Sequence, residues 1–109
     1  MYSYEQIICA MLANYKNTIA LGEINKVIMA FKERRPDFGI IIQNITYIKK
    51  YIEFNKHFIT LKGNLEETVN YDGVIMSLRE YFNMIAGEEL VSFIEEYSNG
   101  HTAKRNWLY

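Results

Sequence analysis

The sequence contains little cysteine, proline, glycine or histidine. The single cysteine, Cys9, rules out a disulfide within the chain, and because it lies in an apolar run we expect it to be buried. Two separated histidines and one cysteine do not give metal-ligand spacing, so we expect no metal site and no cofactor. One proline and six glycines in 109 residues leave room for long elements joined by short connections.

The parts of common catalytic sites and of membrane or export segments are also missing. The sequence has no Gly-Ser elbow and no Gly-rich phosphate loop, and adjacent acids such as Glu88 and Glu89 would project about 100° apart on a helix. We therefore expect that the protein is not an enzyme. No apolar run approaches the roughly 18 residues of a membrane span, and the N-terminus lacks a basic export signal. We expect a cytoplasmic protein.

Charge is distributed unevenly along the chain. The net charge is only −1, but residues 16–62 contain nine lysines and arginines against four acids. Residues 63–99 contain Arg79 alone against eight acids. The near-neutral total thus hides a basic middle and an acidic C-terminal part, which indicates a surface for a polyanion.

The first part of the chain predicts two helices with a short strand between them. Ser3 and Gln6 fit a capping box, and apolar residues then recur at helical spacing over about 4–15. The β-leaning residues 18–21 predict an edge strand. A second apolar stripe predicts a helix over about 22–34.

The next segment predicts a third helix followed by a hairpin. Isoleucines at helical spacing favour a helix over about 41–53, and its outer face carries no acid before Glu53. Two β-rich runs then flank a polar turn at Asn55 and Lys56, with Ile59 and Leu61 pointing inward. We expect a linker over 64–73. Apolar stripes predict a fourth helix from Val74 to Ile85 and, after Gly87, a fifth that ends before Asn99.

Eleven residues between positions 7 and 62, most of them expected in the core, share the order and spacing of a known superfamily: Tyr15, Ile19, Leu21, Ile24, Phe31, Pro36, Phe38, Ile45, Ile48, Phe58 and Leu61. They resemble the winged helix-turn-helix superfamily, with some similarity to its OST-HTH (LOTUS) branch. The implied fold is mainly α-helical with a small β-hairpin. Residues 1–63 would form the winged-helix domain. Residues 64–100 would form an acidic helical extension that packs on it or forms a dimer interface, and 101–109 a tail, within a single compact domain overall.

The resemblance implies that the third helix enters the major groove of DNA while the hairpin, or wing, contacts the backbone. We expect a small sequence-specific protein that binds double-stranded DNA, as a transcription regulator or as an accessory factor at a plasmid or phage site, and a homodimer joined through the C-terminal helices. An AT-rich genome, that of a low-GC bacterium or of its plasmid or phage, is suggested because 42 residues are Ile, Asn, Lys or Tyr, which have AT-rich codons. The candidate contact residues are Gln43, Asn44, Thr46, Tyr47, Lys49, Lys50, Lys56, His57 and Lys62.

Other interpretations stay open at this point. The protein is alternatively an interaction module or phage-type inhibitor whose acidic face imitates DNA, or an RNA-binding protein. Lys49 and Lys50 also fit a solvated helix face. The basic residues 32–35 also fit a helix C-terminus, where cations oppose the helix dipole. Tyr47 and Tyr51 suit packing as well as base stacking.

Overall fold

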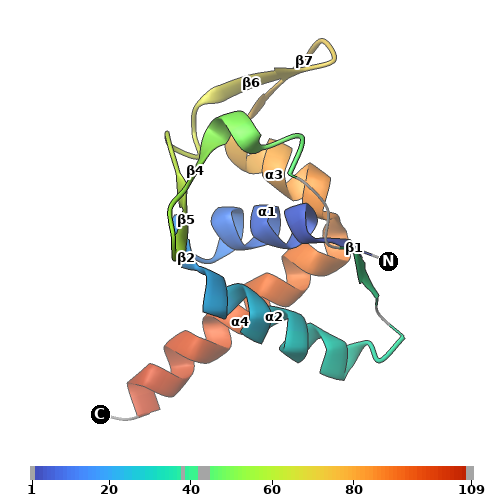
Figure 1. The fold of residues 1–109 in the computed structure, drawn as a ribbon, viewed down its shortest axis with the longest axis vertical. Helices are drawn as coiled ribbons and strands as arrows, with labels where there is room; N and C mark the ends of the chain where they lie inside the picture. The colour runs from blue at the N-terminus through green and yellow to red at the C-terminus, as the bar shows by residue number, and fades with distance from the viewer. Residues whose placement is uncertain (1, 38, 42–44, 108–109) are drawn as a thin grey trace.

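Helices and small sheets form an α/β domain around one hydrophobic core (Figure 1). The computed structural model describes residues 2–37, 39–41 and 45–107, with side chains to residue 100 except that of Ile41. The elements in chain order are β1 (Tyr2–Ser3), α1 (Tyr4–Asn14), β2 (Thr18–Ala20), α2 (Leu21–Arg34), β3 (Ile40–Ile41), the 3₁₀ turn η1 (Lys49–Tyr51), β4 (Ile52–Phe54), β5 (Phe58–Leu61), β6 (Thr68–Tyr71), β7 (Val74–Ser77), α3 (Leu78–Ala86) and α4 (Glu88–Trp107).

Helix α1 is the centre of the core. The predicted capping box is confirmed, because the Ser3 hydroxyl accepts the Gln6 N–H at 3.1 Å and the Gln6 side chain accepts the Ser3 N–H at 2.8 Å. Every residue from 7 to 13 is buried, since α2, α3 and α4 all pack against this helix (Figure 1). Cys9 is buried as predicted, and burial raises the pKa of its thiol well above the usual value.

The predicted edge strand and hairpin are both confirmed and belong to one antiparallel sheet, in the order β2-β5-β4. Ile59 and Leu61 point into the core, as the alternation predicted. The hairpin loop covers 55–57, one residue more than the minimal turn. The Asn55 side chain accepts the N–H groups of His57 and Phe58, both at 2.9 Å, and so closes the loop.

The predicted third helix is wrong. The described part of 41–53 begins in β3, passes through an irregular stretch, and forms only the single turn η1 before β4. β-branched residues dominate this segment, and they favour extended backbone over helix. The buried Glu5 carboxyl group also accepts the N–H groups of residues 46–48, which a helix would use internally. Ile48 and Ile52 are nevertheless buried as expected, although no helix places them there.

The predicted linker over 64–73 contains the first strand of a second hairpin, β6–β7, and α3 therefore begins at Leu78 rather than Val74. The turn consists of Asp72 and Gly73, with φ of 52° and 86°. Two left-handed residues match the twist of antiparallel strands, and Asp-Gly between β-rich runs is a strong hairpin signal. The hairpin projects beyond α3 at one end of the molecule (Figure 1).

The last helix is longer than predicted, because α4 continues through Gly100 to Trp107. Glycine ends a helix readily only in a left-handed conformation, and Gly100 does not adopt one. The apolar stripes of α3 and α4 pack on α1 within the single chain. They therefore give no separate argument for the homodimer, which stays a prediction. Among the described helices, none combines the length and apolar character that crossing a membrane requires.

Most of the described residues that carry the family resemblance are buried or pack against the core. Three of them, Leu21, Pro36 and Phe58, are instead exposed. Phe38 lies outside the described residues, as do the predicted contact residues Gln43 and Asn44.

Candidate functional site

The remaining predicted contact residues lie at the two ends of the β4–β5 hairpin. Thr46, Tyr47, Lys49 and Lys50 precede β4, in the irregular stretch and in η1. Lys62 joins them, because its backbone N–H donates to the Tyr51 carbonyl at 2.9 Å. Three of the predicted lysines therefore gather at one end, although no helix presents them.

The opposite end of the hairpin carries Lys56 and His57, both exposed. This end lies against the start of α2, where the His57 carbonyl accepts the Leu21 N–H at 3.0 Å. The two ends are the length of the hairpin apart. The seven predicted contact residues that the structure describes thus do not form one compact site.

Glu5 holds the stretch before η1 in place. It is only 2% exposed, and its Oε2 atom accepts the N–H groups of Thr46 at 3.1 Å, Tyr47 at 2.7 Å and Ile48 at 3.0 Å. Three hydrogen bonds compensate a carboxyl group for its removal from water. Glu5 was not predicted as a functional residue. The signal that could have indicated it was a single acid in an otherwise apolar helix. Glu5 fixes the backbone that presents Tyr47 and leads into the two lysines.

The exposed lysines of the hairpin differ from most other cations of the chain. Lys49, Lys50, Lys56 and Lys62 form no ion pair within the described residues. Most of the other described cations bind acids: Lys16 with Glu23 at 3.1 Å, Arg34 with Glu96 at 2.6 Å, Arg79 with Glu66 at 2.9 Å, and Arg35 with Asp37 and Glu89. Lys26 and Lys32 on α2 are likewise exposed without an ion pair in the described part of the chain.

Part of the uneven charge along the chain is therefore neutralised by ion pairs within the molecule. Arg34 and Arg35 at the end of α2 bind acids of α4, which explains them structurally. The Tyr2 hydroxyl donates to Glu89, and this hydrogen bond, together with Arg35, lowers the pKa of the Glu89 carboxyl. The lysines of the hairpin have no such partner among the residues that the structure describes.

A groove rich in tyrosine lies beside η1, between this turn and β6. We call it the tyrosine groove; it has a volume of about 480 Å³ and is lined by Thr46, Tyr47, Lys49, Lys50, Tyr51, Val69, Asn70, Tyr71 and Tyr81. The described residues that line it include no acid. Tyr71 and Tyr81 were missed as site residues, because the segment that contains Tyr71 was interpreted as a linker.

Three rings of the tyrosine groove, those of Tyr51, Tyr71 and Tyr81, form a connected cluster. Tyr81 is buried, and its centroid lies 5.5 Å from that of Tyr71 and 6.0 Å from that of Tyr51. Burial raises the pKa of the Tyr81 hydroxyl. Tyr51 is half-buried against this cluster, whereas Tyr47 is 60% exposed and Tyr71 44% exposed. The Lys50 ammonium lies 5.1 Å from the Tyr51 ring centroid.

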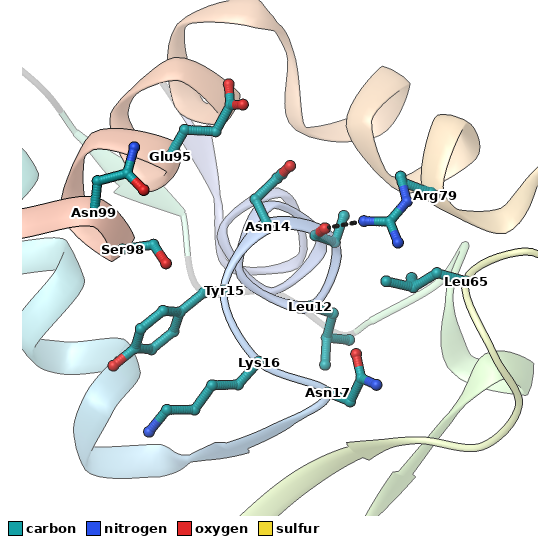
Figure 2. A pocket seen from close by; sticks show the side chains of 11 residues that line it. Leu12, Asn14, Tyr15, Lys16, Asn17, Leu65, Arg79, Glu95, Ser98 and Asn99 are labelled. Atoms are coloured by element: carbon teal, nitrogen blue, oxygen red, sulfur yellow. Dashed lines mark hydrogen bonds between the residues drawn. The ribbon is translucent and has the colours of Figure 1, made fainter. Parts of the chain in front are cut away.

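A second, more polar pocket of about 480 Å³ lies where α1 ends, near α3 and α4 (Figure 2). Arg79 reaches toward the end of α1 and donates to the Ala13 carbonyl at 2.8 Å (Figure 2). The two cations that line this pocket form ion pairs, Lys16 with Glu23 and Arg79 with Glu66. Because both charges are already paired, this pocket is a weaker candidate than the tyrosine groove.

The fold and surface define an α/β domain that carries a basic hairpin and an aromatic groove. In comparisons with known proteins, no family model, no curated protein and no solved structure matched the chain.

Proposed function

We propose that this protein binds nucleic acid, with the β4–β5 hairpin and η1 lying against the phosphate backbone of double-stranded DNA. The observation that carries the proposal is the set of four exposed lysines on these elements that have no acidic partner among the described residues. Lysines that neutralise phosphates release counterions from DNA, which provides affinity without sequence preference.

The order of elements supports a winged-helix scaffold for this activity. A helix, a strand, a second helix and a terminal hairpin follow one another in α1, β2, α2 and β4–β5, and β2 pairs with β5. The third helix of the superfamily is replaced here by η1 and the irregular stretch before it. We therefore assign DNA contact to the hairpin and to η1, and not to an inserted helix that reads base edges. Sequence specificity and a role at a plasmid or phage site remain part of the proposal.

The acidic face supports the alternative, a DNA-mimicking interaction module, less well. Two acids of α4, Glu89 and Glu96, are engaged with Arg35 and Arg34. Such acids stabilise the docking of α4 on α2 rather than face a partner. Glu88 and Glu95 are exposed and are the residues to reverse if this alternative is tested.

The experiment is fluorescence anisotropy with a labelled AT-rich duplex over a series of salt concentrations. If four lysines each neutralise a phosphate, the logarithm of the binding constant falls against the logarithm of salt concentration with a slope on the order of −4. The absence of binding to duplex or single strand at about 50 mM salt would refute the proposal, because low salt favours every such contact.

A further inference from the structure

We propose that the tyrosine groove accepts an unstacked nucleotide, so that the protein prefers nucleic acid with a single-stranded segment beside a duplex. This inference rests on the proposed function. It adds a site and a ligand conformation that phosphate contacts by the hairpin do not require.

The groove offers ring faces of the kind that bind bases. Tyr47 is 60% exposed and Tyr71 44% exposed, and Tyr71 lies against the buried Tyr81 at a ring distance of 5.5 Å. A base placed on Tyr71 would therefore extend an existing aromatic cluster. Aromatic rings bind unpaired bases of any sequence by stacking, whereas bases inside a duplex are already stacked and closed to them.

Charge in the groove suits the phosphates that accompany such a base. Lys49 and Lys50 line the same groove as the tyrosines, and neither has an ion pair within the described chain. The volume of about 480 Å³ lies within the range of small-molecule sites. A neutral apolar ligand would use the rings but leave the two lysines without a partner. A nucleotide uses both.

The groove continues into a second hollow of about 450 Å³, which gives space for a neighbouring base. Tyr47, Tyr71 and Tyr81 line both hollows, and Met84 and Ile85 of α3 line the second one. Glu5, which fixes the backbone of Tyr47, also lies at the second hollow. Because three hydrogen bonds to the buried Glu5 carboxyl group hold this backbone, the backbone at position 47 needs no ordering step on binding.

The test compares three labelled ligands on the full chain: a blunt duplex, the same duplex with a single-stranded overhang, and the overhang strand alone. We expect the overhang duplex to bind about tenfold more tightly than the blunt duplex. The variant Tyr71→Ala should lose this preference and keep its affinity for the blunt duplex. The control is Phe54→Ala, which removes an aromatic ring of β4 that is 52% exposed and does not line the groove. Overhangs of RNA and of DNA, compared in parallel, show which of the two nucleic acids provides the unstacked nucleotide.

The outcomes separate this inference from the proposed function. Equal binding of blunt and overhang duplexes, unchanged in the tyrosine variant, would overturn the inference and leave the hairpin proposal intact. Failure to bind any of the ligands would overturn both. Conversion of a dimer to a monomer by the tyrosine variant, measured by sedimentation, would assign the groove to a second copy of the chain and also overturn the inference. Tyr71→Leu, which removes the same ring and keeps apolar bulk, guards against loss of folding in the alanine variant: it should also lose the preference for the overhang, and a preference retained in this variant would overturn the inference.

Discussion

The two hairpins of this protein differ in charge, in support and in the side chains that they expose. Residues 49–62, which include β4 and β5, carry four lysines and one acid, whereas residues 64–77, which include β6 and β7, carry three acids and no lysine or arginine. The first hairpin belongs to a three-stranded sheet, but the second pairs only with itself. The second exposes Tyr71, Val74 and Ile75.

This difference suggests that the two hairpins have separate roles in binding. In the function proposed above, the first hairpin provides positive charge for phosphates, and the second provides an apolar and aromatic wall. The tyrosine groove lies where they meet, since Lys49 and Lys50 line one side and Tyr71 the other. The three stability predictions below concern the support of the first hairpin, the turn of the second and a contact outside both, and they are ordered from the largest expected effect to the smallest.

The largest effect on stability is expected from Glu5→Ala. The substitution leaves three backbone N–H groups without their acceptor, and the Ile48 N–H is buried. Loss of hydrogen bonds to a charged group, with a buried donor left unsatisfied, should lower the free energy of unfolding by about 3 kcal/mol. Urea denaturation measures this value. The control is Glu53→Ala, an exposed acid of β4, and an equally large loss there would contradict the role given to Glu5.

A smaller effect is expected in the second hairpin from Gly73→Ala. A Cβ atom at this position meets nothing within 4 Å, so its cost comes only from the φ of 86°. An L-residue in that region should lower the free energy of unfolding by about 1 kcal/mol. Gly22→Ala is the matched control, because Gly22 lies in α2 with equal space around it and alanine favours a helix. Thermal unfolding should show opposite signs for the two variants, and equal signs would contradict the assigned turn.

The smallest effect is expected outside both hairpins, at Glu89. Its pKa is lowered by the Tyr2 hydroxyl and by Arg35, so its contribution to stability is present above the usual value of 4.5. That contribution is lost as pH falls through the lower, folded-state pKa. Glu89→Gln should therefore make the melting temperature less dependent on pH below 4.5. Glu88→Gln is the control, since Glu88 has no ion pair in the described chain, and a similar change there would contradict the role of Glu89.

Local signals in the sequence predicted much of the fold. The capping box of Ser3 and Gln6, the strand at 18–20 and the hairpin around Asn55 each depend on neighbours in sequence, and each is confirmed. The irregular stretch before η1 depends on Glu5, some 41 residues away, and periodicity does not report such a contact. The hairpin at Asp72 and Gly73 was missed for a different reason. Its Asp-Gly turn signal is present in the sequence, but the apolar residues after it were interpreted as a helix that begins at Val74.

The candidate site was only partly predictable for the same reason. The lysines were recognisable because charge is visible in composition, and the four predicted ones are all exposed. The tyrosine groove depends on Tyr71 from the second hairpin and on Tyr81 from α3. Tertiary packing brings these rings beside η1, and no spacing in the sequence indicates it.

The central claim is that the lysines of the first hairpin, and not positive charge in general, bind the phosphate backbone. The most direct measurement compares the salt dependence of duplex binding for Lys49→Gln with Lys50→Gln against Lys26→Gln with Lys32→Gln. Both pairs remove two exposed charges that form no ion pair within the described residues. We predict that the first pair reduces the slope by about two and weakens binding on the order of 50-fold at about 0.1 M salt, while the second changes little. Equal losses for the two pairs would contradict the account.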